Sequence, residues 1–439
     1  MVRVVLALLL TAVAPLSAAA ETLQLRVGTL IDPGTGSVTQ DRSLVITDGR
    51  IVSDEPFRGP LPGARFVDLS GKWVLPGLID LHTHVADGYG QTSDPAEPLK
   101  HREAATILKG AEMARITLHA GFTTVRDVGV YRGLTDVALR DAIAAGQVEG
   151  PRMIVSGGYI TIPGGGGAVT GAKPGAVIGP EFRIGEVRSA EQARQRVRLM
   201  IGGGADFIKL IATGAVLAMG SEPGALELTP DVMKAACDEA KGLGKYCIAH
   251  AHGAQGIKAA IEAGARTIEH ASLVDDEGLR LARQRGVWLD MDIFNGDWID
   301  EVGTRDGWPD EYLRKNRETT DVQRAGFAKA VKLGAPITYG TDAGVYPHGL
   351  NARQFGYMVR YGMTPIQALA SATSEAARAL GRADLGSVKP GRVADLVAVG
   401  RDPLQDVTVL QCIDVVIQAG RLIHREDAAE RCDRWKPPQ

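Results

Sequence analysis

Short apolar runs alternate with longer stretches of helical periodicity through the middle of the chain. The helical stretches, such as residues 190–201, 231–243 and 254–263, each precede a glycine, which is typical of a helix end. This alternation predicts successive strand–helix units and a parallel sheet. Eight apolar runs are interpreted as strands: residues 74–81, 123–127, 153–156, 207–211, 246–251, 267–269, 287–291 and 337–340. Eight such units over roughly 300 residues favour an α/β fold closed into a (β/α)8 TIM-like barrel.

Both ends of the chain show a different pattern. Residues 24–27, 43–46, 393–399 and 415–418 are short runs rich in Val, Leu and Ile, separated by Gly, Pro and Asp. These runs predict small antiparallel strands joined by turns. We therefore expect a composite β-sandwich domain from residues 21–72 and 385–424, a metal-binding barrel over residues 73–384, and a tail over residues 425–439.

The first twenty residues resemble a targeting segment more than part of a fold. Arg3 precedes an apolar stretch over residues 4–13, and the small residues Ala18, Ala19 and Ala20 follow. This arrangement predicts a signal peptide over residues 1–20 and an exported protein, periplasmic or secreted, that begins near Glu21. The alternative is a retained membrane anchor, for which the stretch is short. No cysteine follows the cleavage point, so we expect no stable membrane anchor after cleavage.

Composition narrows the class of protein further. The chain of 439 residues has a net charge of −3, with 23% charged and 45% hydrophobic residues, as in ordinary globular proteins. The sequence has no runs of basic residues, which argues against a nucleic-acid-binding protein. Export permits disulfides among the four cysteines. We expect a Cys412–Cys432 bridge, with Cys237 in a helix and Cys247 in a strand as buried free thiols.

Candidate chemistry begins at the end of the first predicted strand. His82 and His84 are two residues apart, so their side chains lie on the same face of a strand and can reach one point. Taken alone, the pair fits a metal site or two ordinary strand histidines. Four more candidates lie at or near other strand ends: Lys209, His250, His270 and Asp342. Because the carboxyl ends of barrel strands meet at one face, the six residues predict a single metal centre.

A lysine among metal ligands is unexpected, because an ammonium group repels a cation. The segment Pro-Gly-Leu-Ile-Asp-Leu-His-Thr-His at residues 76–84, the segment ending at Lys209, and Thr-Asp-Ala-Gly at 341–344 resemble the binuclear amidohydrolase superfamily. Residues 121–127, 250–253 and 268–270 are similar to its imidazolonepropionase-related exported group. That group contains Xaa-Pro and Xaa-Arg or Xaa-Lys dipeptidases and ochratoxin-degrading amidases. Imidazolonepropionase itself lacks the lysine, so Lys209 argues against that activity.

The resemblance implies two divalent metal ions. Zinc suits these ligands best, and manganese or cobalt could substitute for it. It implies that His82, His84 and Asp342 hold one ion, and that His250 and His270 hold the other. A carbon dioxide-derived carbamate on Lys209 would bridge both and remove the charge conflict. A metal-bridging hydroxide would be the nucleophile, and Asp342 would accept its proton and pass it to the leaving amine.

Other residues carry weaker expectations. His252 is a catalytic candidate that could contact the substrate carbonyl or carboxylate, or could make a buried strand-end hydrogen bond. Asp290, Asp292 and Asp297 could meet a cationic substrate group or form a solvated acidic loop. Arg126 and Asp127 are expected to form a structural pair. No role is assigned to His101, His119 and His348.

The resemblance implies an exported hydrolase that cuts an amide bond adjacent to a free carboxylate, as a dipeptidase or carboxypeptidase-like enzyme does. Its substrate would be a small molecule, a dipeptide or N-acyl amino acid. One alternative is hydrolysis of a non-peptide or cyclic amide such as ochratoxin A. Another is a non-catalytic, assembly-forming relative, and the enzyme itself is a possible homo-oligomer.

Overall fold

The computed structural model describes residues 22–87, 89–90 and 93–425. The predicted signal peptide and the tail after Arg425 lie outside the described residues. Within those ranges, no helix combines the length and the apolarity needed to cross a bilayer.

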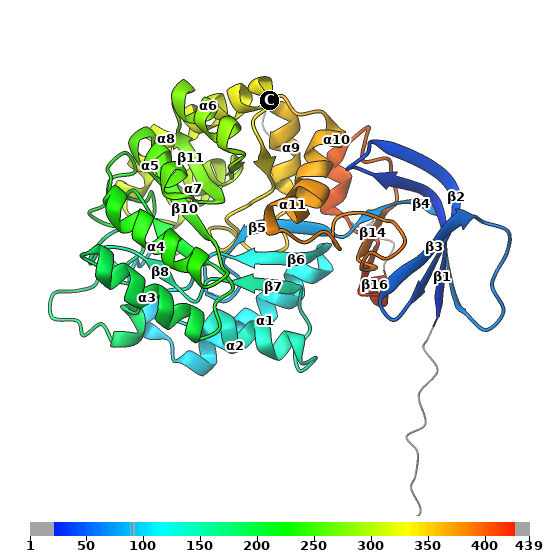
Figure 1. Cartoon of the computed structure of the whole chain (residues 1–439), viewed down its shortest axis with the longest axis horizontal. Coiled ribbons are helices and arrows are strands. Elements are labelled where there is room, and N and C mark those ends of the chain that lie inside the picture. Colours follow the sequence, from blue (N-terminus) through cyan, green and yellow to red (C-terminus); the bar gives the residue numbers. More distant parts are fainter. Residues whose placement is uncertain (1–21, 88, 91–92, 426–439) are drawn as a thin grey trace, which may run out of the picture.

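The central barrel is built from parallel strands (Figure 1). They form a three-stranded sheet, β5-β6-β7, and a six-stranded sheet, β13-β12-β11-β10-β9-β8. The strands are β5 (Leu78–Thr83), β6 (Phe122–Asp127), β7 (Arg152–Val155), β8 (Tyr159–Ile160), β9 (Ile208–Ile211), β10 (Cys247–Gly253), β11 (Thr267–Leu273), β12 (Trp288–Asp290) and β13 (Ile337–Thr338).

The two sheets meet at two seams. At one seam β7 pairs with β6 and β8 pairs with β9, so the third barrel strand is split between Val155 and Tyr159. Gly157 and Gly158 in this gap adopt φ values of 75° and 148°, which side chains disfavour. At the other seam the Asp342 amide donates to the carbonyl of His82 over 2.8 Å. This second seam brings the segment after β13 against the end of β5 and closes the barrel.

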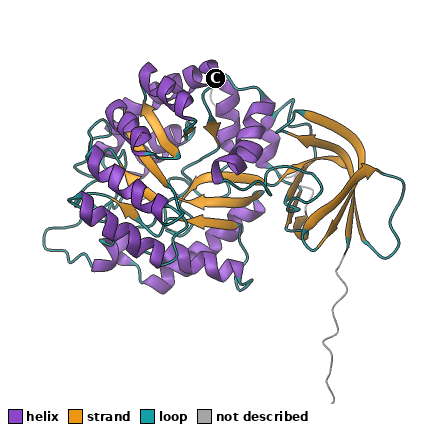
Figure 2. Ribbon diagram, viewed as in Figure 1, coloured by secondary structure: helices purple, strands orange, loops and turns teal. Residues whose placement is uncertain are grey.

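Helices surround the barrel and follow its strands in the chain (Figure 2). They are α1 (Glu103–His119), α2 (Thr135–Ala144), α3 (Ala190–Gly202), α4 (Pro230–Gly242), α5 (Ala254–Ala263), α6 (Asp276–Arg285), α7 (Asn295–Asp306), α8 (Asp310–Leu333), α9 (Arg353–Arg360), α10 (Pro365–Ala370) and α11 (Ala376–Leu380). Shorter 3-10 turns are η1 (Glu97–Lys100), η2 (Pro180–Phe182) and η4 (Val407–Gln411), and η3 (Ser371–Glu375) is a π-helical turn. The local signals are ordinary ones: in α6, Asp275 caps the first turn and Gly286 ends the helix in the left-handed conformation.

The β-sandwich domain joins both ends of the chain. Its strands are β1 (Leu23–Asp32), β2 (Ser37–Thr47), β3 (Arg50–Pro56), β4 (Arg65–Pro76), β14 (Leu396–Val399), β15 (Val415–Gln418) and β16 (Arg421–Arg425). They are hydrogen-bonded in the order β16-β15-β14-β4-β1-β2-β3 and enclose a separate apolar core. The amino- and carboxyl-terminal halves meet where β4 pairs antiparallel with β14, Leu75 opposite Val397. Pairing between segments this distant in sequence gives the domain its composite character.

The predicted fold class, a (β/α)8 barrel with a small β-sandwich, is confirmed. The expected first barrel strand, residues 74–81, needs correction because it is divided at Gly77. Its first part belongs to β4 in the sandwich, and only β5 belongs to the barrel. Gly77 lies so close to Thr123 that an added Cβ would come within 2.3 Å of its hydroxyl oxygen. An apolar run alone does not reveal that the chain passes from one sheet to another here.

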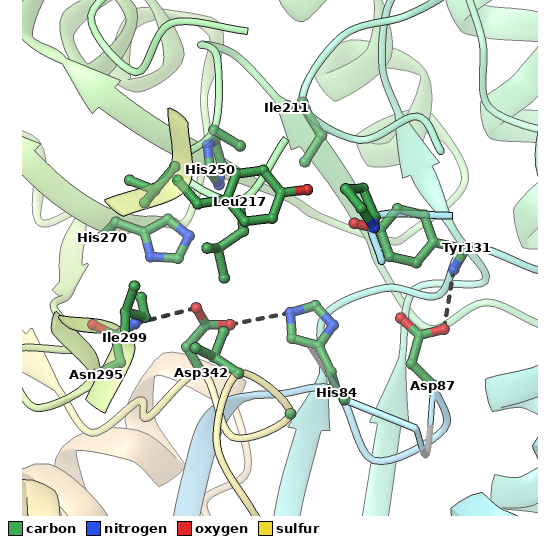
Figure 3. Close-up of a pocket in the computed structure, with 18 of the residues that line it drawn as sticks. His84, Asp87, Tyr131, Ile211, Leu217, His250, His270, Asn295, Ile299 and Asp342 are labelled. Atoms are coloured by element: carbon green, nitrogen blue, oxygen red, sulfur yellow. Dashed lines mark hydrogen bonds and ion pairs between the residues drawn. The ribbon is translucent and has the colours of Figure 1, made fainter. Parts of the chain in front are cut away.

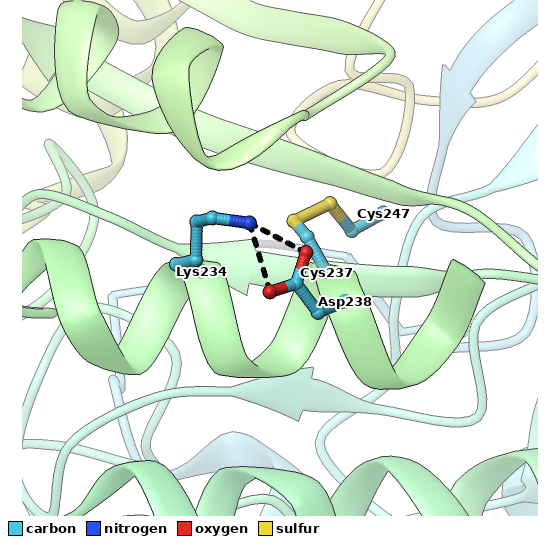
Figure 4. Close-up of a disulfide and its surroundings, with 4 residues drawn as sticks. All are labelled: Lys234, Cys237, Asp238 and Cys247. Carbon is cyan, nitrogen blue, oxygen red and sulfur yellow. Dashed lines mark hydrogen bonds and ion pairs between the residues drawn. A yellow bond between two sulfur atoms is a disulfide. The ribbon is translucent and has the colours of Figure 1, made fainter. Parts of the chain in front are cut away.

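The expectation of two free thiols at Cys237 and Cys247 is wrong. These residues form a disulfide between α4 and β10, with their Cα atoms 5.3 Å apart (Figure 4). The sequence pattern assigns one cysteine to a helix and the other to a strand, but gives no distance between them. The turn after α4 brings the helix back along the strand that follows it. Cys412 is also disulfide-bonded, and its expected partner Cys432 lies outside the described residues.

Candidate metal centre

A cavity of about 140 Å³ opens at the carboxyl ends of the barrel strands (Figure 3). One water needs about 10–15 Å³ by the same measure, so the cavity has room for a small organic molecule. All six predicted ligands line this cavity: His82, His84, Lys209, His250, His270 and Asp342. The structure thus brings together side chains from the ends of four barrel strands, β5, β9, β10 and β11, and from the loop that follows β13.

One group of possible ligands surrounds Asp342. The Nε2 atoms of His82 and His84 lie 3.3 Å and 3.2 Å from Asp342 Oδ1. Their Nδ1 atoms face other acceptors, Glu269 Oε2 at 2.9 Å and the Gly129 carbonyl at 3.0 Å. These outer contacts fix both rings so that the Nε2 atoms remain available to a cation.

A second group contains His250 and His270, whose ring centroids are 4.6 Å apart. His270 Nδ1 lies 3.0 Å from Asp292 Oδ1, and His250 Nε2 lies 3.2 Å from the carbonyl of Gly214. His270 therefore offers Nε2 to a ligand, whereas His250 offers Nδ1. The His270 ring is also 4.8 Å from that of His82, so the two groups are adjacent.

Lys209 lines the same cavity as these groups and is almost entirely buried, at 2% exposure. Within the described part of the chain its Nζ has no hydrogen-bond partner. Burial lowers the pKa of Lys209 to about 8, although Glu269 opposes this shift. A buried amine without a partner is costly, and a lowered pKa increases the neutral, nucleophilic form. The nitrogen is therefore suited to covalent modification.

The pKa values of His250 and His82 are shifted by burial and by neighbouring charges. Burial, together with the neighbouring His252 and His270, lowers the pKa of His250 well below its usual value. Its ring is therefore neutral, as metal binding requires. For His82, burial and Lys209 favour the neutral ring, but Asp342 and Glu269 outweigh them and raise its pKa to about 9. The negative charges of Asp342 and Glu269 that raise this pKa would also favour a cation beside His82.

Glu269 connects the centre to a buried charge network. Its oxygens accept hydrogen bonds from Arg126 Nη2 at 3.0 Å and 3.1 Å. The expected Arg126–Asp127 pair is wrong, because Arg126 faces Glu269 and Asp290, whereas Asp127 accepts from the Ala86 amide. Neighbouring strand residues point to opposite faces, which separates these two side chains.

His252 lies in the same cavity as the predicted ligands. Its Nδ1 is 2.8 Å from Ser272 Oγ, and its ring centroid is 4.6 Å from that of His250. Because Ser272 engages Nδ1, Nε2 is the atom that a substrate oxygen could reach. His250, His252 and His270 also form a group compact enough to hold a cation.

The acidic residues near β12 form hydrogen bonds or ion pairs with other side chains of the protein. Asp290 faces Arg126, Asp292 faces His270, and Asp297 pairs with Arg324 over 2.7 Å. The interpretation of a solvated acidic loop is therefore wrong. Three further histidines lie outside the metal centre: His101 pairs with Glu97, His119 pairs with Glu149, and His348 bonds to Thr117.

Sequence reasoning missed Asp87 in the cavity wall. Asp87 lies beside His84 and accepts a hydrogen bond from the Tyr131 amide over 3.2 Å (Figure 3). The hydroxyl oxygen of Tyr159 lies 3.2 Å from His84 Nδ1. The available signal for Asp87 was its position, three residues beyond His84 at the mouth of the first barrel strand.

Comparison with known proteins identifies the family. The amidohydrolase family model matches residues 73–423. Ochratoxinase from Aspergillus niger is 29% identical over 405 residues, which cover 87% of this chain and 82% of the relative. A solved Xaa-Pro dipeptidase with methionine bound in its active site is 34% identical, with a TM-score of 0.86 over 92% of this chain and 99% of its own.

A prolidase solved with N-methylphosphonate-L-proline is 28% identical, with a TM-score of 0.85 over 92% of this chain and all 100% of its own. The similarity extends over both domains and includes the segments that carry the cavity. The chain is a hydrolase of amide bonds that belongs to the amidohydrolase family, within the group of Xaa-Pro dipeptidases and ochratoxin-degrading amidases.

Proposed function

We propose that this chain is an exported dipeptidase or carboxypeptidase-like enzyme that hydrolyses an amide bond adjacent to a free carboxylate. The single observation that carries the proposal is the convergence of four imidazoles, one carboxylate and the unpartnered amine of Lys209 on one cavity. Enzymes of this family generally use divalent metals, and these donors suit zinc.

The donor set accommodates two cations. His82, His84 and Asp342 would hold one, His250 and His270 the other, and a carbamate on Lys209 both. Carbamylation would replace the buried Lys209 amine, which has no hydrogen-bond partner among the described residues, with a carboxylate that can bind cations. When bound, the metals would supply an acidified water and a polarised carbonyl.

The protein's own groups would then move the proton. Asp342 Oδ1 lies beside the two Nε2 atoms of His82 and His84, and Oδ2 accepts from Asn295 Nδ2 over 3.3 Å. Asn295 and the two histidines thus fix the carboxylate. It would accept a proton from the attacking water and donate it to the leaving nitrogen, while His252 Nε2 orients the substrate oxygen.

The relatives support an amino-acid substrate. One, an Xaa-Pro dipeptidase, was solved with methionine bound, and another, a prolidase, was solved with N-methylphosphonate-L-proline. The similarity to ochratoxinase favours a second candidate, an N-acyl amino acid such as ochratoxin A. All six candidate ligands are present, which argues against a non-catalytic, assembly-forming relative.

A substrate screen tests the proposed activity. The purified protein, loaded with zinc, would be assayed against a dipeptide library that includes Xaa-Pro members, with N-acyl amino acids and ochratoxin A in parallel. We expect about two metal ions per chain, hydrolysis of dipeptides, loss of activity with a chelator, and its return with zinc. A metal-loaded protein that cleaves none of these compounds would contradict the proposal.

Export is the second part of the proposal. The predicted signal over residues 1–20 supports it, and so does the buried Cys237–Cys247 disulfide, because such bonds persist in oxidising compartments. We expect the mature protein to begin at Glu21, which intact mass measurement of the periplasmic or secreted form would show. An uncleaved chain that remains inside the cell would contradict this part. A homo-oligomer is proposed only by analogy with the family.

A further inference from the structure

Asp87 differs from every other carboxylate that lines the cavity. Asp94 pairs with Lys100 over 2.8 Å, Glu97 pairs with Lys100 and His101, and Asp292 and Asp342 face imidazoles. For Asp87 the described residues offer a backbone hydrogen bond from Tyr131 but no ion pair. Among the residues that the structure describes, its negative charge therefore has no cationic partner.

The surroundings of Asp87 favour a small cationic group. Asp87 is half-buried in the cavity wall, and the Tyr131 amide donates a hydrogen bond to its carboxylate. The rings of Tyr131 and Tyr159 stand beside it, edge to face, with centroids 5.6 Å apart. A carboxylate beside aromatic rings is a common arrangement for binding ammonium groups, since both attract positive charge.

The position of Asp87 matches the geometry of a peptide. In a dipeptide the α-ammonium group is attached one carbon away from the scissile carbonyl, so whatever binds it must lie next to the catalytic centre. Asp87 follows His84 by three residues, both line the cavity, and Figure 3 places Asp87 on the far side of His84 from Asp342. The leaving amino acid would then extend toward His252.

We infer that Asp87, with Tyr131 and Tyr159, binds the free α-ammonium group of a dipeptide substrate. This inference rests on the proposed function and adds a specificity to it. A substrate whose acyl side lacks an amine, as in ochratoxin A, would leave the half-buried carboxylate of Asp87 without its partner. Sites of this kind discriminate strongly against such analogues.

The test compares two substrates that differ only in the α-ammonium group: a dipeptide and its des-amino analogue. In the zinc-loaded wild type we expect kcat/KM to favour the dipeptide by about 10- to 100-fold, the range for a hydrogen bond to a charged group. In Asp87→Asn the dipeptide should lose that factor, whereas the analogue should change by less than about twofold. Asp94→Asn, whose carboxylate already has Lys100 as partner, should preserve the wild-type ratio.

Metal content and thermal stability of Asp87→Asn would be measured first, so that a folding defect is recognised. Equal losses on both substrates would overturn the inference, because Asp87 would then act through His84. A wild type that prefers the analogue would also overturn it. If the wild type cleaves neither compound, the proposed function fails, and the role of Asp87 is tested by calorimetry instead.

Calorimetry would compare the binding of a free amino acid with that of its des-amino form, in the wild type and in Asp87→Asn. Tighter binding of the amino acid in the wild type but not in the variant supports the inference. Equal binding of the two compounds by the wild type overturns it.

Discussion

The variant Asp342→Asn should bind metal and fold, yet hydrolyse dipeptides about 10²- to 10⁴-fold more slowly than the wild type. An amide cannot accept the proton that the carboxylate is proposed to move, and general-base catalysis contributes a factor of this size. Asp342 has a φ of 57°, in the left-handed region. Asparagine tolerates this region better than most residues, so the backbone can keep its conformation. The measurement is kcat on the preferred dipeptide, with metal content determined on the same sample.

The matched control is Asp276→Asn, an exposed carboxylate at the start of α6 that pairs with Lys329 at the surface. Its kcat should equal that of the wild type, since surface ion pairs contribute little to stability. Full activity in Asp342→Asn would remove Asp342 from the mechanism. Loss of metal together with activity would show that its role as a ligand is the dominant one.

The variant Lys209→Ala should lose metal and activity together. Replacing the lysine removes the group that is proposed to bridge both cations. Even the mutation of a residue that only hydrogen-bonds to a metal ligand typically lowers metal affinity about 10- to 100-fold. We therefore expect at least about 100-fold weaker zinc binding, measured by competition with a chromogenic chelator. Added formate or acetate should restore part of the binding and part of the rate, because a small carboxylate can occupy the space of the lost side chain.

Lys315 supplies a control for that rescue. It is the other fully buried lysine among the largest buried side chains, but its Nζ donates to the Ser221 carbonyl and to Glu311, and it is not a candidate metal ligand. Lys315→Ala should lose stability, and carboxylic acids should not restore it. Rescue of both variants would mean that the acids act nonspecifically. Undiminished zinc binding in Lys209→Ala would exclude a bridging role.

The six candidate ligands could be found from sequence because their signal is local. A strand has a period of two, so His82 and His84 share a face, and the carboxyl ends of parallel strands gather at one mouth. These two rules place residues that are distant in the chain into one cavity. They apply wherever a side chain sits on a regular element whose end can be recognised.

The residues that support the ligands carry no comparable signal. Glu269 precedes a ligand and looks like any strand residue, although it orients His82 and meets Arg126 in the interior. Gln323 lies within the long helix α8, yet it donates to Asp292, which holds His270. Such contacts depend on how helices pack on strands, which periodicity does not specify. The Cys237–Cys247 disulfide was not predicted from the sequence for the same reason.

The composite sandwich has a consequence for the order in which the protein is made. During synthesis β1 to β4 emerge first, and residues 73–76 of β4 lack their strand partner until β14 follows the entire barrel. An unpaired strand edge is a template for association with other chains. Products that stop before Leu396 should therefore aggregate, whereas release of the complete chain closes the edge and ends the hazard.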